Sequence, residues 1–143
     1  MPSAKNSIVI DRPVPEVFAF VADGEKCTQW RPGVVQIKRV SGDGLGTKYA
    51  QTVQGPMGRS VQADYEITAY EPDRRIEFQT TTGPARPHGR YDFEPANGGT
   101  RVTFSLDAPM GGLRGLLMGS MVQKTMDSEV GMLSNLKRAI EAS

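Results

Sequence analysis

The sequence predicts an α+β fold in which a curved antiparallel sheet of about seven strands grips one long C-terminal helix. Three observations lead to this prediction. Short segments of alternating apolar and polar residues follow one another between residues 34 and 108. A helical pattern separates the first strand from the second, and a proline-free segment with helical periodicity covers residues 113–142. The length of 143 residues predicts a single domain over residues 1–143.

Two short helices are expected between the first and second strands. Residues 5–11 form a short β-branched run, which predicts the first strand. Residues 13–22 then place apolar side chains at helical spacing, and an Asp-Gly pair at 23–24 ends that pattern. Residues 25–30 suit a further turn of helix, which the proline and glycine within residues 31–33 break. The first two strands are therefore connected through helices rather than through a tight turn.

Six strand-like segments follow, each bounded by turn residues. Their ranges are 34–41, 47–54, 59–70, 75–81, 89–94 and 101–107. The segment 59–70 alternates without a break and places one set of side chains on one face: Val61, Ala63, Tyr65, Ile67 and Ala69. The Asn-Gly-Gly sequence at 97–99 suits the tight turn of a hairpin. Together these segments predict an antiparallel meander with one apolar and one solvated face.

The C-terminal segment predicts a helix long enough to cross the whole sheet. About 30 residues at a rise of 1.5 Å span roughly 45 Å. One stripe of this helix is apolar and consists of Met118, Val122, Met126, Val130, Leu133, Leu136 and Ile140. Three glycines lower the helical propensity, namely Gly115, Gly119 and Gly131. Either packing compensates for them, or the helix is kinked.

Composition excludes several classes of function. Lys and Arg number 17 against 16 Asp and Glu, and the resulting net charge of +1 is too small to favour binding to nucleic acid or anionic membranes. Cys27 is the single cysteine and His88 the single histidine, which excludes an internal disulfide and a His/Cys zinc site. The apolar stretch 113–122 contains Arg114 and is too short to span a bilayer. We therefore expect a cytoplasmic protein with no metal, no cofactor, no nucleic-acid partner and no stable membrane insertion.

Four segments, taken in order, carry a resemblance to a known family. They are Pro-Glu-Val-Phe-Ala-Phe-Val-Ala-Asp at 15–23, Trp-Arg-Pro-Gly-Val at 30–34, Gly-Leu-Gly-Thr-Lys-Tyr at 44–49 and Glu-Pro-Asp-Arg-Arg-Ile at 71–76, followed by the final helix. In this combination the chain resembles the START-like, or helix-grip, superfamily, and within it the SRPBCC group of polyketide cyclase/dehydrase and lipid-transport proteins. The resemblance covers nearly the whole chain. It implies a hydrophobic tunnel between the sheet and the C-terminal helix, and a small hydrophobic ligand in it.

The apolar faces of the sheet and the helix would line such a tunnel. We expect the ligand-binding residues to be Trp30, Tyr65, Ile67, Phe78, Tyr91, Phe93, Phe104, Val122, Met126, Glu129, Val130 and Leu133. Aromatic rings offer flat surfaces to a ring or an acyl chain, and methionine adapts to irregular shapes. The same side chains also suit a closely packed core. The two interpretations differ in whether space remains between these residues.

Three polar residues among these positions are the candidates for catalysis. Glu129 lies on or near the inward face of the helix, where a carboxylate suits a general acid or base or holds a ligand hydroxyl. The alternative is that it sits at the margin of that face or pairs with an arginine or lysine from the sheet. Tyr65 and Tyr91 could donate a hydrogen bond to a ketone, and the alternative is that they only pack in the core. His88 is expected on the solvated face, with Arg90 and Asp92.

Three functions follow from these candidates. The first is binding, or transport, of a small hydrophobic molecule such as a lipid, polyketide or aromatic. The second is a cofactor-independent cyclase or dehydratase, a lyase or isomerase acting on a polyketide-like substrate. It needs several inward polar groups, and the sequence supplies few. The third is a protein-interaction or co-chaperone module, which needs an exposed apolar patch.

Overall fold

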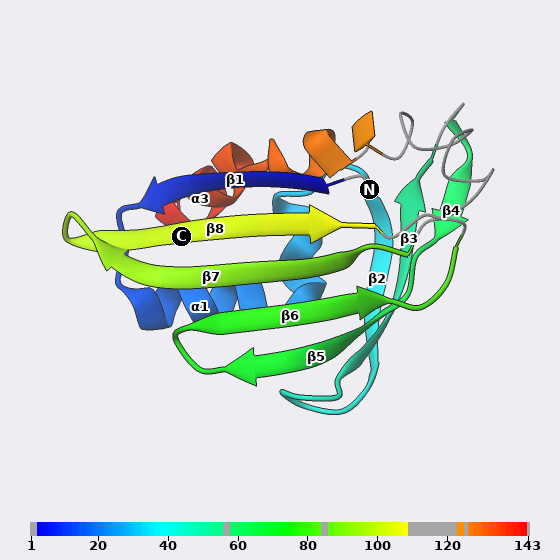
Figure 1. Cartoon of the computed structure of the whole chain (residues 1–143), viewed down its shortest axis with the longest axis horizontal. Coiled ribbons are helices and arrows are strands. Elements are labelled where there is room, and N and C mark those ends of the chain that lie inside the picture. Colours follow the sequence, from blue (N-terminus) through cyan, green and yellow to red (C-terminus); the bar gives the residue numbers. More distant parts are fainter. Residues whose placement is uncertain (1–2, 56–57, 84–85, 109–122, 125, 143) are drawn as a thin grey trace.

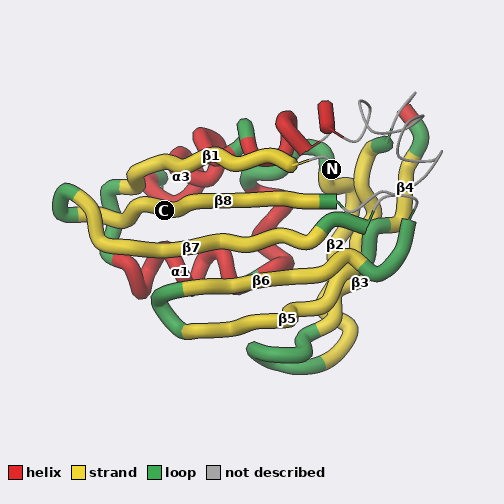
Figure 2. The backbone as a smooth tube through the Cα atoms, viewed as in Figure 1, coloured by secondary structure: helices red, strands yellow, loops and turns green. Residues whose placement is uncertain are grey.

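The protein is described by a computed structural model that covers residues 3–55, 58–83, 86–108, 123–124 and 126–142. An antiparallel sheet curls along one side of the molecule, and the helices lie together on its inner face (Figure 1). Figure 2 shows the same division, with strands on one side and helices on the other. The predicted α+β fold, a curved sheet gripping a C-terminal helix, is confirmed.

Seven strands run side by side across the sheet in one continuous order. This order is β1 (Ser3–Ile10), β8 (Gly99–Asp107), β7 (His88–Ala96), β6 (Arg75–Thr80), β5 (Tyr65–Glu71), β3 (Lys48–Gln54) and β2 (Val34–Ser41). A short eighth strand, β4 (Ser60–Gln62), pairs with the end of β3. β7 and β8 meet in the predicted hairpin, where Asn97 has φ 51° and Gly98 has φ 80°. Both angles are left-handed, as the tight turn requires.

Two short helices connect β1 to β2, as predicted. The first is α1 (Val14–Ala22), which follows Pro13 and carries a proline in its first turn, where the missing N–H is not needed. The second is the 3₁₀ helix η1 (Gly24–Gln29). Its first turn is capped by Asp23, whose Oδ1 accepts a hydrogen bond from the Glu25 amide at 3.1 Å. The buried side chains of α1 are Val17, Phe18, Phe20 and Val21, and η1 buries Cys27.

The C-terminal helix is interrupted by a turn at Gly131 and Met132. Of the two alternatives for the weakening glycines, the structure shows an interruption at Gly131. Residues 126–130 are helical, and α3 (Leu133–Glu141) follows the turn. The Met132 amide donates to the Glu129 carbonyl at 3.1 Å, which tightens the helix before the break. The described part of the apolar stripe is buried on both sides of the turn: Met126, Val130, Leu133, Leu136 and Ile140. The remaining predictions for residues 113–122 fall outside the described residues.

The expected single strand over residues 59–70 is wrong in two respects. The strand is divided after Gln62, because residues 63–64 lie outside β4 and β5; there Oδ1 of Asp64 accepts a hydrogen bond from the Gln51 amide of β3 at 3.0 Å. Within β5, a bulge shifts the register between Ile67, which pairs with Phe78, and Ala69, which pairs with Glu77. Ala69 therefore leaves the inner face, and Tyr70 takes its place there, with its ring centroid 5.4 Å from that of Phe18.

Candidate functional site

A charged pair lies at the junction of η1, β3 and the C-terminal helix. The Nε of Arg31 donates to Oε2 of Glu129 at 3.0 Å, and its Nη2 donates to Oε1 at 3.1 Å. The two side chains are only 13% and 21% exposed. Of the two alternatives for Glu129, the structure shows the ion pair. Its partner follows η1 instead of lying on a sheet strand.

Local structure aims Arg31 at the interior. Its amide donates to the Cys27 carbonyl at 2.8 Å, which continues the last turn of η1, and the chain turns into β2 directly afterwards. Its Nη1 donates to Oε1 of Gln51 at 3.2 Å, and the Gln51 amide nitrogen Nε2 donates to the Ala63 carbonyl at 3.0 Å. A buried glutamine is thus itself held in place while it orients the guanidinium.

Burial changes the acidity of the groups around this pair. It would lower the pKa of Arg31, but the adjacent Glu129 carboxylate outweighs that effect and holds the pKa above its ordinary value. Burial raises the pKa of Tyr91 and of Tyr65, with Arg31 opposing the change in both. Burial also raises the pKa of Cys27, against the opposing effect of Arg31. At neutral pH the cluster therefore holds a charged guanidinium beside neutral hydroxyl and thiol groups.

A row of aromatic rings extends from this cluster across the inner face of the sheet. Tyr65 and Phe78 have ring centroids 5.2 Å apart, and Phe78 and Tyr91 are 6.2 Å apart. Tyr91 then stacks on Phe104 at 4.3 Å with an angle of 7° between the rings. Phe78 can cross β7 only because its partner there is Gly89, where a Cβ atom would lie 2.0 Å from the ring. The glycine thus keeps the aromatic row continuous.

The structure places the predicted site residues in one buried cluster. Those that it buries fully are Trp30, Tyr65, Ile67, Tyr91, Phe93, Phe104, Met126, Val130 and Leu133. Phe78 is half-buried against them, Glu129 is half-buried in its ion pair, and Val122 lies outside the described residues. Phe93 is apart from the polar cluster, because it packs on Phe18 of α1 at 5.1 Å.

Three residues of the polar cluster were missed by reasoning from the sequence. Arg31 was considered only as part of a helix-breaking segment, and Cys27 only as the single cysteine of the chain. Gln51 has the same strand parity as Tyr49, so the alternation of side chains along β3 predicts an inward position for it. Nothing in the local sequence pairs Arg31 with Glu129, since 98 residues separate them. His88 lies on the outer face as expected, with Nε2 3.0 Å from Oε1 of Glu77.

The described residues show neither a metal-binding group nor a membrane span. No set of three or more His, Cys, Asp or Glu side chains among them is arranged to hold a metal ion. Within the same residues, no helix has the length and apolar character needed to cross a membrane.

Comparisons with known proteins identify the fold and the family. The crystal structure of a Thermus thermophilus protein matches with a TM-score of 0.83 and 24% identity, covering 99% of this chain and 98% of that one. A START superfamily protein from Mycobacterium smegmatis matches with a TM-score of 0.78 and 16% identity, over 98% and 97% of the two chains. The di-domain ARO/CYC protein StfQ of the steffimycin biosynthetic pathway matches with a TM-score of 0.79 and 12% identity, and the match covers 99% of this chain and 51% of StfQ.

At these identities the solved structures establish the helix-grip fold alone. A comparison with curated proteins gives no match. The family described as polyketide cyclase/dehydrase and lipid transport matches residues 1–141, so the chain belongs to that family.

Proposed function

We propose that the protein binds a small hydrophobic molecule with a neutral, oxygen-bearing end between the inner face of the sheet and the C-terminal helix. Family membership supports a ligand-binding or cyclase/dehydrase domain of this kind. The observation that carries the finer proposal is the Arg31–Glu129 pair beside the aromatic row. The rings suit the apolar body of the ligand, and the polar cluster suits its oxygen.

The hydrogen bonds of Arg31 support a neutral oxygen as the group that it recognises. A guanidinium has five N–H donors. Among the described residues, three are used on Glu129 and Gln51, and the guanidinium also interacts with Cys27. At least one donor has no partner within this described part of the chain and is available to a ligand. Because Glu129 already neutralises the charge of Arg31, a carbonyl or hydroxyl fits this donor better than a carboxylate does.

The energetic cost of burying the Arg31–Glu129 pair also supports a role for Arg31 in ligand binding. Two charges held out of water add little net stability, and apolar residues of similar size often replace such a pair without loss. A structural role alone therefore accounts poorly for a guanidinium held at this position by three bonds from two other elements. A ligand that the guanidinium orients accounts for it directly.

A cyclase or dehydratase is the second candidate, and Tyr91 is the observation in its favour. Its hydroxyl lies in the electrostatic reach of Arg31 and Glu129, and its raised pKa keeps it protonated as a donor to a ketone. A proton acceptor is also needed. Glu129 is held in two hydrogen bonds to Arg31, so it must leave that pair before it can remove a proton. Binding without this rearrangement is the simpler function.

The interaction-module alternative has weaker support. Among the described residues, the large apolar side chains that are exposed are Val35, Val40, Leu45 and Tyr70. They come from β2, the following loop and β5, and Tyr70 also packs on Phe18. Exposed apolar residues spread over several elements are ordinary in a folded protein.

A calorimetric titration with matched probes tests the proposal. A long-chain methyl ketone should bind more tightly than the alkane of the same length, and the difference should vanish in the double variant Arg31→Met/Glu129→Leu. This variant removes both charges and keeps the packing, so it is preferred to a single substitution. Arg101→Met is the matched control, because Arg101 pairs with Glu94 at the surface. Equal binding of the two probes by the wild-type protein would contradict the proposal.

A further inference from the structure

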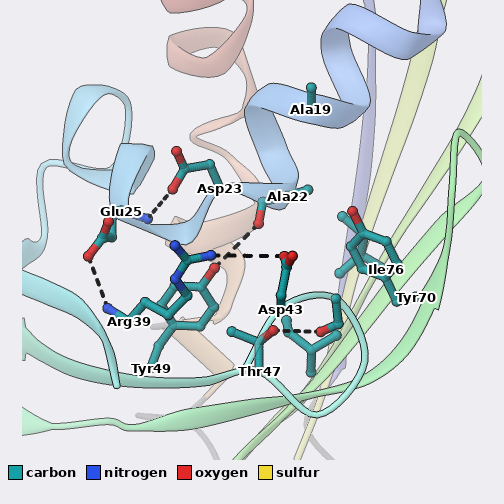
Figure 3. Close-up of a pocket in the computed structure, with 12 residues that line it drawn as sticks. Ala19, Ala22, Asp23, Glu25, Arg39, Asp43, Thr47, Tyr49, Tyr70 and Ile76 are labelled. Atoms are coloured by element: carbon teal, nitrogen blue, oxygen red, sulfur yellow. Dashed lines mark hydrogen bonds and ion pairs between the residues drawn. The ribbon is translucent and has the colours of Figure 1, made fainter. Parts of the chain in front are cut away.

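A second site, a pocket, lies between the N-terminal helices and the inner face of the sheet. It has a volume of about 290 Å³ and is formed by the end of α1, the start of η1, the β2–β3 loop and strands β3, β5 and β6. Figure 3 shows its lining residues converging from these elements on one space. Ile67 is the only residue that it shares with the described part of the predicted ligand site.

The pocket is hollow because its walls are built from small residues and a displaced aromatic ring. Ala22 of α1 lines the pocket with a small, half-buried side chain, so a larger residue there would take up part of the space. Gly44 has φ 71°, and a Cβ atom there would lie 3.6 Å from the Tyr70 ring. The bulge in β5 turns Tyr70 into this wall, opposite Ile76 of β6. Without that bulge, the small Ala69 side chain would face the helices instead.

Hydrogen bonds hold the loop that forms the lower wall. Oγ1 of Thr47 donates to the Gly44 carbonyl at 2.7 Å. The Gly46 amide donates to the Ile67 carbonyl at 2.9 Å, and the Ile67 amide donates to the Thr47 carbonyl at the same distance. The β2–β3 loop is therefore tied to β5 from both directions. The pocket is a preformed feature of the fold and needs no rearrangement to accept a ligand.

The mouth of the pocket is acidic. Three carboxylates, Asp23, Glu25 and Asp43, line it together with one guanidinium, that of Arg39. Arg39 reaches Asp43 only at 3.9 Å, and the two side chains are 51% and 98% exposed, so their attraction is weak. Oε2 of Glu25 accepts a bond from the Arg39 amide at 3.1 Å. Negative charge therefore exceeds positive charge beside the aromatic walls.

We infer that this pocket binds a small organic cation in which an ammonium group is attached to a short, flat apolar body. The body fits between Tyr70, Ile76 and Ala22, and the ammonium replaces Arg39 in the weak pair with Asp43. Tyr49 presents its ring to the same space, and a cation over such a ring gains further attraction. The volume is near the lower end of the range for ligand pockets, which favours a molecule the size of an arylalkylamine.

This site is separate from the one proposed above. Tyr49 lines the second pocket, whereas Tyr65, which stacks on it at 4.9 Å, belongs to the cluster of Cys27 and Arg31. The backbone of Gly24 packs against both tyrosines: a Cβ atom there would lie 2.6 Å from the Tyr65 hydroxyl and 2.7 Å from the Tyr49 ring. The two tyrosines and this glycine form the wall between the sites, so the inference does not depend on the proposed function.

The test is an amide NMR titration of the whole protein with three phenylalkyl probes of similar size. Phenethylamine should bind saturably and shift the amides of Gly44, Thr47 and Tyr70, and phenethyl alcohol should bind about fivefold more weakly. Hydrocinnamate, the anionic probe, should bind more weakly still. Ala22→Leu should weaken amine binding strongly by occupying part of the pocket. Asp43→Asn should weaken it, whereas Glu94→Gln, which removes an exposed carboxylate elsewhere, should not.

Three results would overturn the inference. They are alcohol or anion binding as tight as amine binding, unchanged amine binding in the Ala22→Leu variant, and an equal loss in the Asp43→Asn and Glu94→Gln variants. Each variant is first compared with the wild type by its amide spectrum, so a folding defect is recognised. Ketone binding at the Arg31 cluster should be the same in Ala22→Leu as in the wild type, which separates the failure of one site from the failure of the other.

Discussion

Arg31 meets Glu129 through two hydrogen bonds of 3.0 and 3.1 Å, and this contact joins the end of η1 to the C-terminal helix. Planar guanidinium and carboxylate groups are complementary in this double arrangement. The contact also limits how the C-terminal helix lies on the sheet, since Glu129 is one turn after Met126 and next to Val130, which are both buried. The pair thus positions the helix that covers the proposed ligand site.

Arg31→Met should lower the free energy of unfolding by about 3 kcal/mol, because it leaves the Glu129 carboxylate buried without its partner. The double variant Arg31→Met/Glu129→Leu should recover most of this loss, since neither charge is then present. Urea unfolding followed by tryptophan fluorescence measures both values, with Trp30 as the reporter. Equal losses in the single and double variants would show that packing, rather than the unpaired charge, determines the effect.

Gly89→Ala should destabilise the protein by about 1–3 kcal/mol, because the added methyl group overlaps the Phe78 ring. Gly33→Ala is the matched control: a Cβ atom at Gly33 meets nothing within 4 Å. Thermal unfolding of both variants measures the difference. Replacing Phe78 by leucine in the Gly89→Ala background should restore part of the lost stability. If the two alanine variants unfold alike, Phe78 does not lie across β7 as described.

The protein should lose stability as the pH rises above about 9. Burial raises the pKa values of Cys27, Tyr65 and Tyr91 in the folded state. The unfolded chain therefore releases these protons first. The contribution of the three groups to the free energy of unfolding is complete below their unfolded pKa values, and it is lost as the pH rises from those values through the folded ones. Urea unfolding at a series of pH values from neutral to alkaline measures this dependence.

Tyr91→Phe is the variant that isolates one of these groups. Its stability should fall less steeply with pH than that of the wild type, because one titrating hydroxyl is removed. The ultraviolet absorbance of ionised tyrosine supplies an independent measurement, since Tyr65 and Tyr91 should ionise only together with unfolding. Ionisation of every tyrosine near pH 10 in a protein that is still folded would contradict the buried positions.

The hairpin between β7 and β8 should tolerate glycine at position 97 but not valine. Asn97 has φ 51°, a left-handed angle that asparagine and glycine adopt readily. Asn97→Val should cost about 1–2 kcal/mol, because a β-branched residue is strained there. Asn97→Gly should stay close to the wild type. Thermal unfolding of the two variants measures the contrast, and a valine variant as stable as the glycine variant would argue against this turn.

The sheet and its order of elements were predictable because they depend on local patterns. Alternating residues, an Asn-Gly turn and the helical spacing within α1 are each visible over ten residues or fewer. The bulge in β5 was not predictable in this way. The bulge adds one residue, Thr68, to one strand. The alternation of apolar and polar residues continues past Thr68 in the sequence, but in the structure the side chains after it point to the opposite faces from those that the alternation predicts. Tyr70 consequently faces α1, against the simple parity rule.

The site was predictable only where a single element determines it. The inward position of Glu129 follows from the helical stripe, and that of Tyr91 follows from strand parity. The partner of Glu129 depends on how η1 lies against the C-terminal helix, and no pattern in the sequence contains that relation. The second pocket depends on a loop, a bulge and a helix end at once. Its lining residues share no spacing that could have grouped them.

The pairing of β1 with β8 also determines when the molecule can be completed during folding. Ser3 pairs with Asp107 and Ile10 with Thr100, so the earliest strand of the chain finds its neighbour only after six other strands have been passed. The Arg31–Glu129 contact requires a similarly distant partner. Contacts between such distant segments slow folding, because a long loop must close before they form. The ribosome therefore releases most of this domain before its sheet can be finished, and β1 has no strand partner during that interval.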